Sequence, residues 1–174
     1  VHPERLSAVA RDPAFLEVYD RLMRKADRER TNQQTWFANN HPQIVDRPIA
    51  YFCAEFGLHN SVPIYSGGLG VLSGDHIKSA SSLAVPLVAI GLFYDQGYFK
   101  QHLDGNGFQQ EEYLDTRVEN LPMVPAKGPD GNPVTISIET RDGGLKAKVW
   151  LMNVGRVPLY LLDCDVDGNS PQDR

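Results

Sequence analysis

Three closely spaced glycines stand in residues 65–75, which read YSGGLGVLSGD, just before a helix-like segment at residues 73–84. Glycine has no Cβ atom, so the backbone can turn sharply there and a ligand can come close. The first amides of a helix have no intrahelical partner and attract anions. The pattern predicts a main-chain cradle for a phosphate or a similar polar group. Its residues would be Gly67, Gly68, Leu69 and Gly70.

The glycine spacing differs from the common phosphate motifs. The dinucleotide fingerprint is G-x-G-x-x-G, and the spacing of Gly68, Gly70 and Gly74 is one residue longer. The P-loop needs Gly-Lys-Ser/Thr, but Ile77 precedes Lys78. A tight strand-to-helix turn without a ligand therefore stays open as an interpretation, because such turns also serve packing alone.

Polar side chains near the glycines are further candidates for a cleft. Glu55 follows an apolar run at residues 49–54, and α/β sheets bind ligands at the carboxyl ends of their strands. Asp75 and His76 are expected in the first turn of the helix, where an acid also suits the helix dipole. A solvated or loop-capping acid and a local hydrogen-bond partner are the structural alternatives.

Residues 94–102, YDQGYFKQH, are polar and aromatic and follow a second apolar run at residues 86–93. They should lie beyond the same sheet edge as the glycines. Glu111 and Glu112 are adjacent, so their carboxylates point apart and are expected to be solvated. Glu111 is a candidate by position only.

The predicted fold class is α/β, with a mainly parallel sheet, an added β-hairpin and N-terminal helices. Strand, glycine segment, helix and strand follow one another in residues 48–120, which is the order of a βαβ unit. Its first strand is apolar almost throughout, as in a strand covered on both faces. Residues 121–174 alternate apolar and polar side chains on either side of a turn at residues 141–144, which predicts a hairpin, and end with a buried strand at 157–163.

Residues 1–47 are expected to form a helical lead-in. Asp12 is a good N-cap, and Pro13 fits the first helical turn. Phe15, Tyr19 and Leu22 recur at helical spacing, which predicts an amphipathic helix lying on a core. A second short helix is expected at residues 33–38.

Composition excludes several classes of function. The 174 residues carry a net charge of −5, which gives no electrostatic footprint for nucleic acid. No apolar run approaches the roughly 20 residues of a membrane span, and no signal peptide is evident. Cys53 and Cys164 are expected as free thiols in a reducing cytoplasm. No metal site is expected, because there is no C-x-x-C and the acids at 163, 165 and 167 lack a ligating glutamate.

Four segments resemble the N-terminal domain of the α-glucan (glycogen/maltodextrin) phosphorylases, most closely those of the short bacterial branch. They are AYFCAEFGL at 50–58, PIYSGGLGVLSGDHIKSA at 63–80, GLFYDQGYFKQ at 91–101 and VGRVPLYLLD at 154–163. The chain starts with valine and ends without a closing element, so it is expected to be a fragment of a longer enzyme. One departure is Gly57, where the mammalian type has a tyrosine.

The resemblance implies a GT-B glycosyltransferase, in which two Rossmann-like domains face a cleft. The enzyme would phosphorolyse α-1,4-glucan with inorganic phosphate to α-D-glucose 1-phosphate, with retention, and a homo-oligomer is possible. Pyridoxal 5'-phosphate would be the cofactor, its Schiff-base lysine lying in a C-terminal domain absent here. Gly67, Gly68 and Leu69 would line the cleft near the phosphates, and the fragment should be inactive alone.

Two other classes of protein stay open. A glycogen or starch synthase-like GT-B enzyme shares the Gly-Gly-Leu loop, but such enzymes usually place a lysine just before it, where this chain has Tyr65 and Ser66. A non-catalytic α/β module that binds sugar or protein would be complete within the 174 residues.

Overall fold

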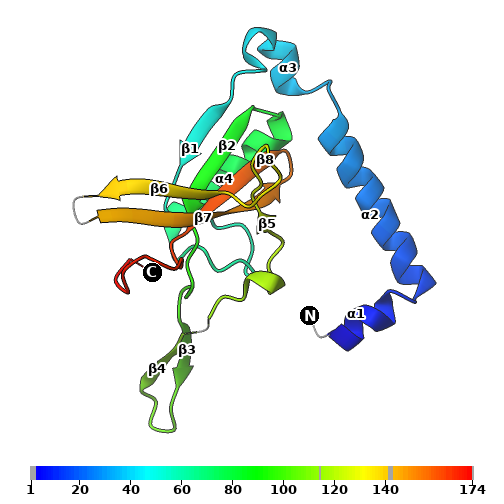
Figure 1. The fold of residues 1–174 in the computed structure, drawn as a ribbon. Coiled ribbons are helices and arrows are strands. Elements are labelled where there is room, and N and C mark those ends of the chain that lie inside the picture. Colours follow the sequence, from blue (N-terminus) through cyan, green and yellow to red (C-terminus); the bar gives the residue numbers. More distant parts are fainter. Residues whose placement is uncertain (1–2, 114, 141–142, 174) are drawn as a thin grey trace.

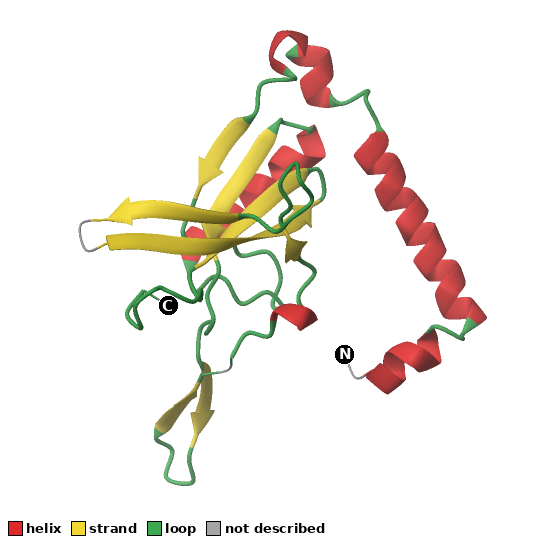
Figure 2. Ribbon diagram, in the orientation of Figure 1, coloured by secondary structure: helices red, strands yellow, loops and turns green. Residues whose placement is uncertain are grey.

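The computed structural model describes residues 3–113, 115–140 and 143–173. A six-stranded sheet forms the body of the molecule, and one long helix, α4, packs on one of its faces (Figure 1). An N-terminal helical arm and a two-stranded hairpin extend from this body (Figure 2). The strand order of the main sheet is β1-β2-β8-β7-β5, with β6 paired to β7.

The predicted βαβ unit is confirmed. β1 (Ile49–Phe52) and β2 (Leu87–Leu92) pair in parallel, and α4 (Gly68–Leu83) connects them. β8 (Val157–Asp163) adds to β2, also in parallel, where the buried final strand was predicted. The carboxyl ends of these three strands therefore share one edge of the sheet.

The antiparallel part of the sheet is larger than the single hairpin that was predicted. β7 (Gly143–Val154) pairs with β6 (Thr135–Thr140), with β8 and with the short β5 (Val124–Pro125). The two predicted arms of the hairpin are confirmed as β6 and β7. Two residues of the predicted turn, Arg141 and Asp142, lie outside the described residues.

A second hairpin extends from the body (Figure 1). β3 (Lys100–Leu103) and β4 (Gln109–Glu112) form it, and all their residues are exposed. The Asp104 carboxylate accepts hydrogen bonds from the amides of Phe108 and Asn106, which lower its pKa and hold the turn between the two strands. Short 3-10 helices lie at Pro42–Ile44 and Val118–Asn120.

The core lies between α4 and the sheet. Phe56, Ile64, Ile77, Leu159 and Leu161 are almost completely buried there. β1 contradicts the expectation that it would be covered on both faces, since Phe52 is 72% exposed and Ile49 is exposed as well. The reason is its position: β1 is an edge strand, and within the described part of the chain only α4 packs against this half of the sheet.

The chain that leaves β1 crosses α4 at very short range. The Gly57 amide donates to the Gly70 carbonyl at 2.7 Å, and a Cβ atom on Gly74 would lie 2.1 Å from the Gly57 carbonyl oxygen. No side chain fits between the two backbones. Glycine at 57 and 74 thus allows this crossing, which fixes where α4 begins relative to the end of β1.

The N-terminal arm consists of α1 (Pro3–Val9), α2 (Pro13–Thr31) and α3 (Trp36–Asn40). The predicted cap of α2 is confirmed, because Asp12 Oδ1 accepts from the Ala14 amide at 2.9 Å. α3 begins at residue 36 rather than 33 because Thr35 caps it. The expectation that α2 lies on a core is wrong: it has no buried residue, and its apolar face stays exposed.

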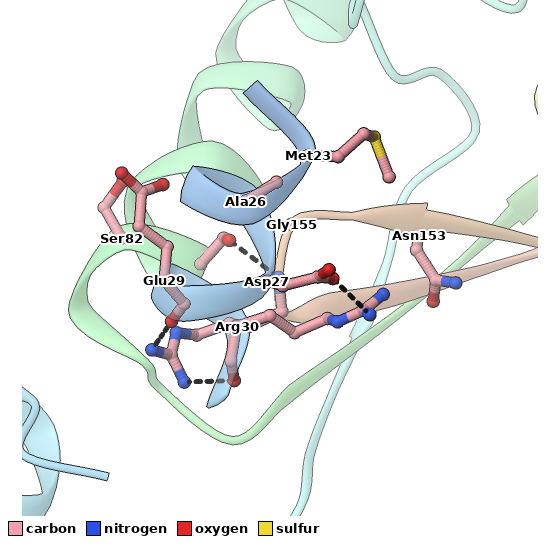
Figure 3. Close-up of a pocket in the computed structure, with 10 residues that line it drawn as sticks. Met23, Ala26, Asp27, Glu29, Arg30, Ser82, Asn153 and Gly155 are labelled. Atoms are coloured by element: carbon pink, nitrogen blue, oxygen red, sulfur yellow. Dashed lines mark hydrogen bonds and ion pairs between the residues drawn. The ribbon is translucent and has the colours of Figure 1, made fainter. Parts of the chain in front are cut away.

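Arg156 joins the arm to the sheet. It lies in the β7–β8 turn, and its guanidinium donates to the carbonyls of Glu29, Arg30 and Asn32 at the end of α2, the latter two at 3.0 Å. Helix ends carry unpaired carbonyls and partial negative charge, so a cation stabilises them. A cavity of about 540 Å³ lies between this end of α2 and the turn (Figure 3).

Gly74→Ala should destabilise the fold, because the added methyl group would collide with the Gly57 backbone. We expect a loss of about 1–3 kcal/mol in the free energy of unfolding, as in other overpacked cores, measured by urea denaturation. Gly105→Ala is the matched control, since no atom lies within 4 Å of a Cβ there. Equal midpoints for the two variants would contradict the crossing as described.

Arg156→Ala should free the end of α2 while leaving the sheet folded. We expect the amides of residues 28–32 to exchange with deuterium about 10-fold faster, because the variant loses about 1.4 kcal/mol of charge-assisted hydrogen bonding. Hydrogen exchange followed by mass spectrometry measures this. Arg24→Ala, on the same helix, should leave the exchange of these amides unchanged.

Candidate functional site

The glycine segment is the start of α4. Gly67 is the N-cap, and the helix begins at Gly68, not at Ser73 as predicted. Gly68 and Gly70 have helical backbones, although glycine in a helix costs about 1 kcal/mol relative to alanine. The predicted start was too late because glycine has a low helix propensity. Tertiary contacts with the segment after β1 stabilise the helix at these residues in spite of that propensity.

Two amides at this helix start are free to bind a ligand. Among the described residues, no hydrogen bond occupies the amides of Gly68 and Leu69. The Ser66 amide donates to Glu55 Oε2 at 3.3 Å, and the Val71 amide donates to the Gly67 carbonyl at 3.2 Å. The available cradle is therefore narrower than the predicted one, which ran from Gly67 to Gly70, and the amides of Gly68 and Leu69 are its centre.

The glycines of this segment differ in whether packing requires a glycine at their position. A Cβ atom on Gly70 would lie 2.5 Å from the Tyr65 Cβ, so packing requires glycine there. A Cβ atom on Gly67 or Gly68 would meet nothing within 4 Å, and neither residue has a positive φ. Nothing inside the described chain demands glycine at these two positions. Their effect is to keep space open beside the free amides, as a close ligand requires.

Glu55 supports the helix start from the end of β1. Its Oε1 accepts from the Ser66 hydroxyl at 2.9 Å, and its main-chain carbonyl accepts from the Ser73 hydroxyl. The hydrogen bonds from Ser66, together with the nearby amides of Gly67 and Gly70, hold the pKa of Glu55 below its ordinary value. Of the two structural alternatives, these hydrogen bonds support the loop-capping acid.

Asp75 and His76 do not lie in the first turn of the helix. Because α4 begins at Gly68, they stand about two turns further along, and both are exposed. The His76 ring lies edge-on to the Tyr51 ring, with centroids 4.6 Å apart. The expected interaction of Asp75 with the positive helix end is therefore wrong.

Glu111 lies on β4, in the hairpin that extends from the body (Figure 1). It is exposed, as expected of a solvated acid. Its neighbour Glu112 is not simply solvated, because its carboxylate contacts His102 Nε2 at 2.9 Å across the hairpin. The structure does not bring Glu111 to the glycines.

A cavity of about 220 Å³ opens beside Glu55, at the carboxyl end of the parallel strands. It confirms that the polar-aromatic segment after β2 reaches the same edge as the glycine segment. Pro63, Tyr65 and Ser66 had not been predicted as site residues, although the last two directly precede the glycine pair. The lining consists of Glu55, Pro63, Tyr65, Ser66, Tyr94, Gln96, Gly97 and Tyr98.

In the described residues, no group of three histidine, cysteine or acidic side chains could hold a metal ion. Asp163, from the acidic triplet near the end, is buried and accepts from the Trp150 indole at 2.9 Å beside Lys148. None of the helices described has both the length and the apolar character needed to cross a membrane.

Comparison with known proteins relates the chain to enzymes of glucan metabolism. A family described as "Protein of unknown function (DUF3417)" matches residues 1–62. Over 98% of this chain, the sequence is 44% identical to the maltodextrin phosphorylase of Thermococcus litoralis. Over the same share of the chain, it is 41% identical to the glycogen phosphorylase of Mycobacterium tuberculosis. The glycogen phosphorylase of Aquifex aeolicus is 36% identical over 79% of the chain.

The chain covers 20% of the length of each of these relatives. The segments on which the resemblance was based extend from residue 50 to residue 163, and the identity extends over nearly the whole chain. The chain is thus similar to about one fifth of a glycogen or maltodextrin phosphorylase, and the predicted resemblance to that family is confirmed.

Proposed function

We propose that this chain is the part of an α-glucan phosphorylase that supplies the glycine segment of the active-site cleft. The observation that carries the proposal is the open space at Gly67 and Gly68 beside the free amides of Gly68 and Leu69. It occurs in a chain that is 44% identical to a maltodextrin phosphorylase. The reaction would be phosphorolysis of α-1,4-glucan to α-D-glucose 1-phosphate, with retention, in a GT-B enzyme.

The helix start would bind a phosphate oxygen through two main-chain N–H groups. Donors that are already aimed need no reorganisation during the reaction, and this makes them effective for charged transition states. Glu55 would keep Ser66 and the start of α4 in position through its two hydrogen bonds to Ser66. Leu69, 57% exposed, would form an apolar wall of the cleft.

The cradle would fit a phosphate of either the substrate or a cofactor, because no atom lies within 4 Å of a Cβ position at Gly67 or Gly68 and the space beside the free amides is therefore open. Pyridoxal 5'-phosphate would supply a phosphate group for proton transfer, and its lysine would come from a domain outside this chain. The relatives are about five times as long as the chain, which leaves room for that domain. We therefore expect the chain alone to be inactive, with its two free cysteines suiting a reducing cytoplasm.

The complete polypeptide that contains this chain should release glucose 1-phosphate from maltodextrin and inorganic phosphate. Gly68→Ala should lower kcat/KM by about 100-fold, because the methyl group would occupy the cradle, while the melting temperature stays the same or rises, since alanine favours a helix more than glycine does. A coupled assay of glucose 1-phosphate measures this. Gly105→Ala, also a glycine with open space around it, is the matched control and should keep full activity.

Two results would contradict the proposal. An open reading frame that ends at Arg174 would favour a stand-alone module instead, because the rest of the cleft would then be missing. Equal kcat/KM for Gly68→Ala and the unchanged enzyme would remove the glycine segment from the site.

Protonation of Glu55 should release the Ser66 amide. The folded pKa is lowered, so the stabilising hydrogen bonds are fully present above the ordinary carboxyl pKa of about 4.3 and are lost as the pH falls through the lower, folded value. Amide NMR spectra of the chain should show the Ser66 signal titrating below about pH 4.3. Glu55→Gln should abolish this titration, whereas Glu17→Gln should leave it unchanged. A Ser66 signal that ignores Glu55→Gln would contradict the contact.

A further inference from the structure

We propose that a cavity at the base of the β3–β4 hairpin binds the phosphate group of a small phosphate monoester. The cavity has a volume of about 390 Å³ and lies where the hairpin joins the body (Figure 1). We call it the basic cavity, because Lys100 and Arg117 line it. Its lining includes no residue of the glycine segment, so this inference does not rest on the proposed function.

Three segments of the chain meet at the basic cavity. Gln96 and Asp115 form an isolated antiparallel bridge, and Gln96 Nε2 donates to Asp115 Oδ1 at 3.2 Å, so the segments before and after the hairpin are held together. A Cβ atom on Gly97 would lie 2.5 Å from the Pro63 Cβ, so the loop before the glycine segment packs closely on the chain that leads into the hairpin. These contacts fix the backbone from which the lining side chains extend.

Positive charge exceeds negative charge in this lining. Lys100 and Arg117 are its cations, and Asp115 is its single carboxylate. No ion pair within the described residues involves either cation. The whole chain has a net charge of −5, so the excess of positive charge is local to the basic cavity. The planar fork of an arginine matches two phosphate oxygens and a lysine adds a point charge, so the pair suits an anion with two negative charges.

Uncharged side chains add hydrogen-bond donors to the lining. Asn60 Oδ1 accepts from the Tyr65 hydroxyl at 3.4 Å, which leaves the hydrogens of Asn60 Nδ2 to donate to a ligand. Asn120 contributes a second, exposed amide. The Thr116 hydroxyl is buried and has no hydrogen-bond partner among the described residues. An unpaired buried hydroxyl is unfavourable, and rotation of the Thr116 side chain toward a ligand oxygen would satisfy it.

Part of the lining is apolar, and this favours an ester over free phosphate. Tyr98 is 65% exposed, and its ring stacks on Phe99 with centroids 4.6 Å apart. Leu121 and Pro63 add aliphatic surface to the same cavity. A volume of about 390 Å³ lies in the range of small-molecule pockets and is larger than a free phosphate needs. The cations and amides would take the phosphate group, and the Tyr98 side would take a small organic group.

Amide NMR titrations of this chain with phenyl phosphate, at constant ionic strength, test the assignment. Phenyl phosphate should shift the signals of residues 60, 61 and 115–121. It should bind about 10-fold more tightly than inorganic phosphate, because its ring can pack on Tyr98. Tyr98→Ala should abolish this preference for the ester.

Arg117→Gln tests the role of charge. It should weaken the binding of phenyl phosphate by about 10-fold, because the charge-assisted hydrogen bonds to the phosphate are lost. Arg47→Gln is the matched control, since it removes an exposed arginine that does not line the basic cavity. Arg117 is exposed as well, so the spectrum of either variant should otherwise match that of the unchanged chain.

Three results would overturn the site. They are the absence of shifts at residues 60, 61 and 115–121, equal shifts caused by benzyl alcohol, which has the ring without the phosphate, and unchanged affinity in Arg117→Gln. Equal affinities for phenyl phosphate and inorganic phosphate would overturn the assignment of an ester. Shifts at Gly68 and Leu69 report on the proposed function instead, and Arg117→Gln should leave them unchanged.

Discussion

The site depends on the close crossing of two backbones after β1. Gly57 and Gly74 let the chain that leaves the sheet touch α4 directly, and the Gly57 amide donates to Gly70. This contact brings Glu55 over the start of α4, where its carboxylate takes the amide and hydroxyl of Ser66. A side chain larger than glycine at the crossing would separate the two segments and move every donor of the cradle.

The same crossing determines which amides near the start of α4 have a hydrogen-bond acceptor within the chain. Glu55 satisfies Ser66, the helix satisfies Val71, and the amides of Gly68 and Leu69 remain between them. The Glu55 carboxylate also lines the cavity at the carboxyl end of the parallel strands. Its hydrogen bonds from Ser66 hold the residue that directly precedes the glycine pair.

Local patterns in the sequence predicted much of the fold because their causes are local. The capping of α2 by Asp12, the βαβ order and the two arms of the β6–β7 hairpin depend on short-range chemistry and periodicity. The predicted start of α4 and the predicted packing of α2 on a core were wrong, since both features depend on residues distant in sequence. Propensity disfavours glycine in a helix, yet the Gly57 contact holds Gly70 in the first turn of α4.

By itself, the sequence determined the family relation, the glycine segment as a candidate ligand site and Glu55 as a neighbour at the strand end. Only the tertiary structure decided which glycines serve packing and which leave open space, because that depends on atoms from other segments. It also moved Asp75 and His76 away from the helix start and placed Tyr98 in the wall of the cavity beside Glu55. Spacing along a chain gives the order of groups, whereas the distances between segments follow from how the chain packs.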